Sequence, residues 1–199
     1  MSESKEEYCS WDKIDFADIE LGEIIGGGGV GLIYNGWIKG QRDAVAIKTL
    51  FDTRISEDLK KEYIDELLIL SRIKHSNIIN FLGACMTPPH LFFVMELCSC
   101  SLFDKLHKYR ENLLPPECLR IAIDISSAME YLHALSPVII HRDLKSLNVL
   151  QAYDGSMKVC DFGLVKVRNT QAGKICALVY THIFVIYKSL DLVNGCFYS

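Results

Sequence analysis

Two short segments in the second half of the chain carry side chains that could bind a metal ion and accept a proton. In residues 141–148, HRDLKSLN, the carboxylate of Asp143 precedes the carboxamide of Asn148 by five residues. Asp143 could accept the proton of an attacking hydroxyl group, and Asn148 could ligate Mg²⁺. Asp161, the first residue of the segment DFG, could supply a second magnesium ligand. Either segment alone would be ordinary loop sequence, but together they indicate phosphoryl transfer.

A glycine-rich run lies near the N-terminus, between two runs that favour β-strands. Residues 26–31, GGGGVG, follow Ile24-Ile25 and precede Leu32-Ile33-Tyr34. Glycine lets backbone amides approach phosphate groups closely. The run alone supports a flexible hairpin turn equally well. A dinucleotide-binding Rossmann fold is disfavoured, because a strand rather than a helix follows the glycines.

The segment 45–48, VAIK, predicts a short strand in which Ala46 and Lys48 share one face. A lone lysine on a strand is usually a solvated edge residue. Glu66 changes this expectation, because it falls on the apolar stripe of a helix predicted over residues 56–73. A buried carboxylate that lacks a cationic partner costs roughly 3–5 kcal/mol. Lys48 can pair with Glu66 and hold nucleotide phosphates at the same time.

The elements that would position these residues form two architectures in succession. From Phe16 to about Leu97, β-prone runs surround one helix, and from Leu102 to Leu135 the chain is helical. We therefore expect a sheet-rich lobe, an extended connector over 97–101, and a helical lobe. The inserted helix should begin with Ser56 as its N-cap. Its buried stripe is expected to contain Leu59, Tyr63, Glu66, Leu70 and Ile73.

Two further elements are predicted in the helical part of the chain. A helix that follows Pro115-Pro116-Glu117 should bury a stripe of apolar residues. Asp154-Gly155 predicts a hairpin between residues 149 and 159, and this hairpin would place Asp161 directly at its end. The stripe consists of Ile121, Ile125, Ala128, Met129 and Leu132.

Composition excludes several classes of protein. The 199 residues are 50% hydrophobic and 23% charged, which is typical of a globular protein, and the net charge of −4 disfavours nucleic-acid binding. The eight cysteines lack zinc-type CxxC pairs and predict reduced thiols. Residues 1–7 are polar without a signal segment, and Ser2 stands where myristoylation needs glycine. The absence of a signal segment predicts a cytoplasmic or nuclear location, of which we expect the cytoplasm. The longest apolar stretch, 175–187, is too short for a membrane span.

The motifs are most informative in their order. The glycine run, V-A-I-K, the helical glutamate, H-R-D-L-K-x-x-N and D-F-G together resemble the signature set of eukaryotic protein kinases over roughly residues 14–169. The resemblance implies a bilobal α+β fold, with an antiparallel sheet and one helix in the N-lobe and a helical C-lobe. It also implies that ATP and Mg²⁺ bind in the cleft and that a protein substrate is phosphorylated.

The resemblance assigns a role to each candidate residue. It implies that Asp143 is the base, that Lys48 and Glu66 position the phosphates, that Lys145 assists catalysis, and that Asn148 and Asp161 hold Mg²⁺. The residues implied to contact the nucleotide are Gly26, Gly28, Gly31, Ile33, Ala46, Lys48, Glu96 and Cys98.

Finer features resemble the tyrosine-kinase-like group, which includes mixed-lineage and Raf-type enzymes. These features are residues 11–19, residues 24–48 (IIGGGGVGLIYNGWIKGQRDAVAIK), HSNIINFLGAC and HRDLKSLNVL. By this resemblance Met95 is the gatekeeper, and residues 96–98 form the hinge that meets adenine. Lys145 follows the serine/threonine pattern rather than the tyrosine pattern. Cys160 would lie at the back of the ATP site, although a small core residue is the better interpretation.

The kinase pattern stops after the DFG segment. The 36 residues that follow Gly163 contain no A-P-E sequence, and 17 of residues 175–199 are apolar. We therefore expect an N-terminal extension over 1–13, an N-lobe over 14–97, an incomplete C-lobe over 98–174 and an atypical tail over 175–199. One hypothesis is that the tail is translated intron, because Gly173-Lys174 can be encoded by GGTAAG. The alternative is a divergent tail that caps the lobe.

Two functions follow from these observations. The first is an ATP-dependent protein kinase that acts on serine and threonine. The second is a nucleotide-binding but inactive fragment that acts as a binding or regulatory module. All the catalytic side chains are present, which favours the first, whereas the missing substrate platform favours the second.

Overall fold

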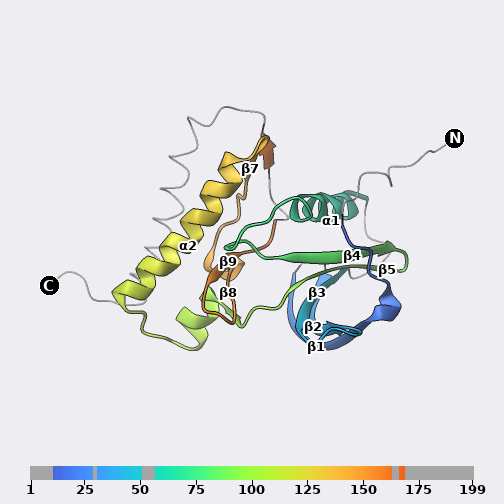
Figure 1. The fold of residues 1–199 in the computed structure, drawn as a ribbon, viewed down its shortest axis with the longest axis horizontal. Coiled ribbons are helices and arrows are strands. Elements are labelled where there is room, and N and C mark those ends of the chain that lie inside the picture. Colours follow the sequence, from blue (N-terminus) through green and yellow to red (C-terminus); the bar gives the residue numbers. More distant parts are fainter. Residues whose placement is uncertain (1–10, 29–30, 51–56, 163–165, 169–199) are drawn as a thin grey trace. The chain divides into compact units, whose positions relative to one another are not determined.

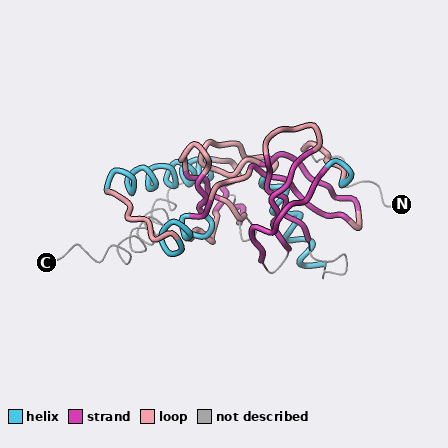
Figure 2. Tube along the Cα trace, turned by 90° about the horizontal axis from the view of Figure 1, so that it is seen from below, coloured by secondary structure: helices cyan, strands magenta, loops and turns pink. Residues whose placement is uncertain are grey.

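The computed structural model describes residues 11–28, 31–50, 57–162 and 166–168. The chain divides into two compact units. The N-terminal unit consists of the residues up to Lys74 together with Asn80–Leu97, and the C-terminal unit consists of His75–Ile79 together with the residues from Cys98 onward. Strands dominate the first unit, and the second contains the long helix of the molecule (Figures 1 and 2).

The N-terminal unit is built on a five-stranded antiparallel sheet in the order β1-β2-β3-β5-β4. Its strands are β1 (Ile19–Gly28), β2 (Gly31–Ile38), β3 (Ala44–Leu50), β4 (Phe81–Thr87) and β5 (His90–Glu96). Successive side chains of a strand point to opposite faces of the sheet, so on β3 Val45 and Ile47 share one face while Ala46 and Lys48 share the other.

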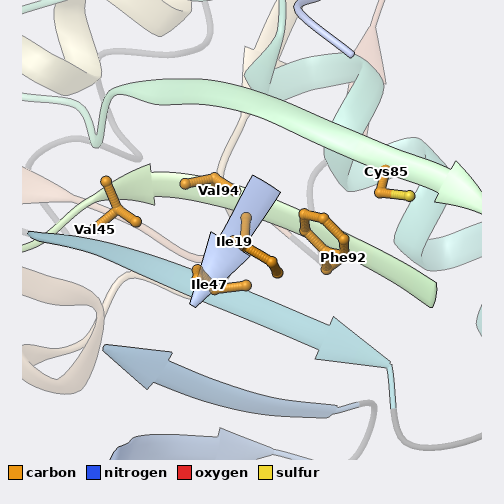
Figure 3. Close-up of a cluster of buried hydrophobic side chains, with 6 residues drawn as sticks. All are labelled: Ile19, Val45, Ile47, Cys85, Phe92 and Val94. Carbon is orange, nitrogen blue, oxygen red and sulfur yellow. The ribbon is translucent and has the colours of Figure 1, made fainter. Parts of the chain in front are cut away.

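The core of this sheet is a cluster of six buried side chains (Figure 3). Val45 and Ile47 point into it from β3, which leaves Ala46 and Lys48 on the opposite face, as the two-residue period of a strand requires. The alternation predicted for VAIK is therefore confirmed. The cluster consists of Ile19, Val45, Ile47, Cys85, Phe92 and Val94.

The helix of the N-terminal unit, α1 (Glu57–Leu70), ends earlier than the sequence predicted. Arg72 donates its backbone N–H to the carbonyl of Ile69, which is the tighter bond of a terminating turn. The predicted end at Ile73 was wrong by three residues, yet Ile73 is buried beyond the helix, as are Glu66 and Leu70 within it. The expected N-cap Ser56 lies outside the described residues, and the side chains of Leu59 and Tyr63 are not described.

The residues before β1 lie along the free edge of β4. Ile14 donates its backbone N–H to the carbonyl of Ala84, and Ala84 donates to the carbonyl of Asp12, both at 3.1 Å. The ring of Trp11 meets that of Phe81 edge-on at 6.4 Å between centroids. This pairing covers an otherwise open strand edge, and the sequence-based boundary at residue 14 runs through it.

The C-terminal unit contains the helix α2 (Pro115–Ala134), two helical turns (Asp104–Lys108 and Ser146–Asn148) and two small sheets. The stripe predicted for α2 is fully buried, and the helix begins with the two prolines, whose missing N–H groups are not needed there. The sheets pair β6 (Cys100–Ser101) with β8 (Val149–Gln151) and β9 (Met157–Val159), and β7 (Val138–Ile140) with β10 (Lys166–Arg168).

The hairpin predicted around Asp154-Gly155 is confirmed as β8 and β9. Asp154 Oδ1 accepts hydrogen bonds from the backbone N–H and the hydroxyl of Ser156, and Gly155 has a φ of 87°. Glycine adopts this left-handed conformation without steric cost. The hairpin therefore brings the chain to Asp161 along a defined path.

The segment His75–Ile79 leaves the N-terminal unit and joins β9. Val159 donates its N–H to the carbonyl of Asn77 at 2.8 Å, and Ile79 donates to the carbonyl of Val159 at 2.9 Å. The side-chain amide of Asn77 donates to the carbonyl of Met157 at 3.0 Å. These bonds join residues about eighty positions apart, which sequence patterns did not reveal.

Within the described ranges, no helix is both long and apolar enough to cross a membrane. The cysteines among the described residues are free thiols: Cys85, Cys98, Cys100, Cys118 and Cys160.

Candidate active site

Lys48 and Glu66 form a close ion pair in the N-terminal unit. Lys48 Nζ lies 2.7 Å from Glu66 Oε2 and 2.9 Å from Oε1, and the two side chains are 15% and 5% exposed. Lys48 Nζ also lies 5.3 Å from the centre of the Phe93 ring, within range of a cation–π contact. The buried carboxylate has the cation that the sequence required. The pair holds the lysine ammonium at a fixed point on the sheet.

The glycines lie in the hairpin that joins β1 to β2. Gly26 is opposite Ile33, and Gly28 is opposite Gly31. Residues 29–30 between them lie outside the described residues. Ile33 is in turn opposite Lys48 on β3. Because cross-strand partners point to the same side of a sheet, Ile33 and Lys48 share one face.

Two of the other predicted nucleotide contacts, Ala46 and Glu96, lie further along the sheet. Ala46 is buried and is opposite Met95 on β5, which places Met95 on the Lys48 face as well. Glu96 accepts a hydrogen bond at 2.6 Å from the backbone N–H of Asn80 through Oε1. Its carboxylate thus anchors the end of β5. Cys98, half-buried, is the first residue beyond Leu97 in the C-terminal unit.

In the C-terminal unit, Asp143 is held by two neighbours from its own loop. Lys145 Nζ lies 2.6 Å from Asp143 Oδ2, and Asn148 Nδ2 donates to the same oxygen at 3.0 Å and to the Asp143 carbonyl at 2.8 Å. The short helical turn Ser146–Asn148 carries Asn148 back towards Asp143. The structure therefore brings together three of the residues that the sequence singled out.

His141 connects this loop to the segment that carries Asp161. Its Nδ1 accepts the backbone N–H of Asp143 at 3.3 Å, so Nε2 must carry the proton that it shares with the carbonyl of Cys160 at 2.9 Å. Cys160 in turn donates its N–H to the carbonyl of Asn148 at 3.0 Å. The His141 ring also meets Phe162 at 5.1 Å, and both side chains are buried. Asp161 is thus fixed between two anchored residues.

Two residues of the site adopt left-handed backbone conformations. Arg142 has a φ of 67° and Asp161 a φ of 64°. Aspartate tolerates this region moderately well, whereas a long side chain such as arginine rarely adopts it. Such strain persists only where the surroundings hold it, and it is concentrated at functional sites. It occurs here directly before Asp143 and at Asp161 itself.

The charges of the loop raise the pKa of Lys145 above its ordinary value. The hydrogen bond to Asp143 is the main cause, and the negative charges of Asp143 and Asp161 act in the same direction, against a smaller opposing effect of burial. Lys145 therefore stays protonated at physiological pH. Its positive charge lies beside the carboxylate that is the candidate base.

The oxygen donors of Asn148 and Asp161 fit a magnesium ion that brings other ligands with it. Since the Asn148 amide nitrogen faces Asp143, its side-chain oxygen is the atom that can meet a cation. Among the described residues, no group of three or more His, Cys, Asp or Glu side chains is arranged to hold a metal. Mg²⁺ commonly binds one or two protein oxygens together with water and phosphate oxygens, so the donor set suits a magnesium-nucleotide.

Sequence reasoning missed three participants in this arrangement. His141 was part of a motif but received no role, Phe93 was not singled out, and the carbonyl of Cys160 cannot be recognised from a side-chain pattern. The motif HRD offered a signal for His141. Only the long-range pairing of β3 with β5 identifies Phe93.

Comparison with known proteins agrees with the motifs. A family model described as the protein kinase domain matches residues 19–186. Serine/threonine-protein kinase STY46 of Arabidopsis thaliana is 38% identical over 173 residues, which is 86% of this chain and 29% of the relative. A probable serine/threonine-protein kinase of Dictyostelium discoideum is 38% identical over 170 residues, 83% of this chain and 18% of the relative. For the Arabidopsis kinase CTR1 the identity is 38% over 158 residues, 78% of this chain and 19% of the relative. The chain spans less than a third of each of these proteins.

Proposed function

Because this chain belongs to the protein kinase domain family, we propose that it binds Mg²⁺-ATP and transfers the γ-phosphoryl group to serine or threonine hydroxyl groups of protein substrates. The observation that carries this proposal is that each unit holds its part of the machinery in place. Lys48 and Glu66 are paired in the N-terminal unit, and Asp143, Lys145 and Asn148 are bonded to one another in the C-terminal unit.

In this proposal the N-terminal unit binds the nucleotide. Lys48 contacts the phosphates, and Glu66 prevents the lysine ammonium from turning away. The backbone amides of Gly26, Gly28 and Gly31 approach the phosphates, which side chains at these positions would obstruct. The adenine would meet Ile33 and Ala46, with Met95 as gatekeeper and residues 96–98 as hinge. The sheet face shared by Ile33 and Lys48 supports this assignment.

The C-terminal unit would carry out the transfer. Asp143 would accept the proton of the substrate hydroxyl as the hydroxyl oxygen bonds to the γ-phosphorus, while the bond from that phosphorus to the β–γ bridging oxygen breaks and ADP leaves. Lys145 places positive charge beside this step, and Asn148 and Asp161 hold Mg²⁺. When bound, the metal ion neutralises negative charge on the phosphates in the transition state. The protein groups are fixed beforehand, so they need little reorganisation during the reaction.

Specificity for serine and threonine is supported by Lys145, which follows the serine/threonine pattern, and by the relatives, which are named as serine/threonine-protein kinases. We further propose that the chain belongs to the tyrosine-kinase-like group and acts in the cytoplasm. The proposed N-lobe covers residues 14–97 and the proposed incomplete C-lobe residues 98–174. The intron hypothesis for residues 175–199 would be contradicted by a genomic sequence without a downstream exon that encodes A-P-E.

A nucleotide-binding module without transfer activity is the alternative, because no A-P-E sequence follows DFG in this chain. The two functions differ in one measurement. We expect the unmodified chain to transfer radiolabelled phosphate from Mg²⁺-ATP to a generic protein acceptor, and Asp143→Asn to lose that activity while still binding Mg²⁺-ATP. Binding without transfer in both proteins would support the alternative. Absence of binding in both would contradict the two functions together.

A further inference from the structure

The first strand of the sheet contains an irregularity just before the glycine run. On β1, Leu21 is opposite Gly36 and Ile24 is opposite Tyr34, so Gly22 and Glu23 together face a single residue of β2, Asn35. Two residues opposite one define a β-bulge, which bends a strand and redirects the residues after it. In this chain those residues lead directly into the glycine hairpin, 26–31.

The side chain of Asn35 satisfies the backbone of the bulge. Its Oδ1 accepts the N–H of Glu23 at 2.6 Å, which gives a partner to one of the two residues that share Asn35 as their neighbour on β2. Asn35 is half-buried, and the hydrogen bond is exposed to solvent. The bond therefore directs the strand, whereas its contribution to the stability of the whole unit is small.

The absence of a side chain at Gly22 leaves room for this contact. A Cβ atom at Gly22 would lie 2.3 Å from Asn35 Oδ1 and 3.1 Å from the Asn35 carbonyl oxygen. No side chain fits there while Asn35 keeps its hydrogen bond. Two positions thirteen residues apart, Gly22 and Asn35, are therefore matched to one geometry.

The bulge affects the register of the hairpin, that is, which residues of β1 and β2 pair with one another. A second irregularity follows between Ile24 and Gly26, after which Gly26 pairs with Ile33 and Gly28 with Gly31. A slip of one residue in a strand turns every side chain to the opposite face, so a bulge that is loosely held lets the glycines change partners. Asn35 also shares the sheet face of Ala46, its partner on β3, two residues from Lys48.

We propose that Asn35 is a positioning residue for nucleotide binding: by holding the bulge at Gly22-Glu23, it sets the direction and register of the glycine hairpin that receives the phosphates of Mg²⁺-ATP. This inference rests on the proposed nucleotide binding and names a residue outside the kinase signature motifs. Asn35 acts through the hairpin and need not touch the nucleotide.

The test compares three variants of the full chain. Asn35→Leu removes the acceptor but keeps a side chain that branches at Cγ, Asn35→Asp keeps an oxygen at the same place, and Asp15→Ala is the matched control. Asp15 makes a similar exposed bond just before β1, because its Oδ1 accepts the N–H of Ala17 at 3.0 Å. Two quantities are measured: the Kd of Mg²⁺-ATP by calorimetry, and the hydrogen-exchange rates of Glu23 and of the hairpin amides.

We expect Asn35→Leu to raise the Kd about threefold to tenfold, the equivalent of one hydrogen bond, and to speed exchange at Glu23 and the hairpin. Asp15→Ala should bind and exchange like the unmodified chain in the hairpin, and Asn35→Asp, which keeps the acceptor but adds a negative charge, should keep the slow exchange at Glu23. Unchanged affinity in Asn35→Leu would overturn the inference while leaving the proposed function intact. Failure of the unmodified chain to bind Mg²⁺-ATP at all would instead overturn the proposed function, and this inference with it.

The Gly22–Asn35 match provides a second readout that a purely structural defect would not reproduce. Gly22→Ala should weaken binding strongly in the unmodified chain but less in an Asn35→Ala background, where the added methyl group no longer meets Asn35 Oδ1 and only the backbone carbonyl oxygen of residue 35, 3.1 Å away, remains close. Strictly additive effects of the two substitutions on Kd would contradict the coupling, and with it the role of Asn35 at the bulge.

Discussion

At the scale of single residues, the site depends on backbone bonds as much as on the charged groups that would take part in the chemistry. His141 is 2% exposed and joins the backbone N–H of Asp143 to the carbonyl of Cys160. Asp143 bonds to this ring directly, Lys145 and Asn148 bond to Asp143, and Asp161 follows Cys160 in the chain. A residue without a role in the reaction can therefore decide whether the reacting groups are in place.

We predict that His141→Phe destabilises the chain by about 1–3 kcal/mol, because the buried histidine bonds to Asp143 and Cys160 are lost. Phosphate transfer should fall further than the affinity for Mg²⁺-ATP, since Asp143 and Asp161 lose their common anchor. Urea unfolding and the two activity measurements check this. His107→Phe is the control, because His107 is exposed. Equal losses in both variants would contradict a special role for His141.

The pair Lys48–Glu66 could be predicted from sequence, whereas His141–Cys160 could not. A glutamate on a buried helical stripe needs a cation, and Lys48 on a neighbouring strand was the available one. That argument uses charge and periodicity, which sequence contains. The partner of His141 is a backbone carbonyl, identical in every residue, and Glu23–Asn35 has the same character. When one partner of a hydrogen bond is a backbone atom, no residue type marks that partner in the sequence.

A second prediction for a single residue concerns the stability of the folded chain at acidic pH. Asp104 accepts hydrogen bonds from the hydroxyl of Ser101 at 2.6 Å and from its backbone N–H, and the Ser101 hydroxyl bond is the main reason that the pKa of Asp104 lies below its ordinary value of 3.8. Burial opposes this shift, and the charge of Lys108 supports it. A lowered pKa stabilises the folded chain above about pH 4, and this contribution is lost as the pH falls through the lowered value.

Ser101→Ala should therefore raise the pKa of Asp104, so that the acid-induced loss of stability begins at higher pH. An NMR titration of the Asp104 carboxyl carbon, together with urea unfolding across the acidic range, measures both effects. Ser99→Ala is a suitable control because Ser99 bonds to the carbonyl of Gln151 instead. An unchanged titration of Asp104 in Ser101→Ala would show that another group sets this pKa.

At the scale of elements, local sequence patterns predicted whether a segment forms a helix or a hairpin better than they predicted where that element ends. α2 and the hairpin β8–β9 formed where the apolar spacing and Asp154-Gly155 indicated. The end of α1 was misplaced because Ile73 is buried by the surrounding structure without being helical. The insertion of residues 75–79 beside β9 depends on Val159, far along the chain, and no local pattern contains it.

We predict that Gly83→Ala detaches the N-terminal segment from β4. A Cβ atom at Gly83 would lie 2.5 Å from the carbonyl oxygen of Asp12 and 2.7 Å from Ile14 Cδ1, so backbone must move. Overpacking of this kind costs about 1–3 kcal/mol. Thermal unfolding and faster amide exchange at Ile14 and Ala84 check the prediction.

Gly40→Ala is the control, because it makes the same substitution at a glycine where no atom obstructs the added methyl group. A Cβ at Gly40 meets nothing within 4 Å, although the φ of 82° makes alanine unfavourable there. Gly40→Ala should leave exchange at Ile14 and Ala84 unchanged. If both variants loosened these two amides, the close approach at Gly83 would not be the cause.

At the scale of the whole molecule, the question is whether the chain folds cooperatively and binds a nucleotide. A ligand that binds only the folded state raises its stability by about 2.7 kcal/mol when present at about 100 times its Kd. We predict that Mg²⁺-ATP raises the midpoint of thermal unfolding of the full chain, and that Lys48→Met, which removes the ammonium paired with Glu66, abolishes the rise. The measurement is differential scanning calorimetry with and without nucleotide. A cooperative transition that Mg²⁺-ATP leaves unmoved in the unmodified chain would argue against nucleotide binding, and an equal rise in Lys48→Met would place the nucleotide away from the Lys48 face of the sheet.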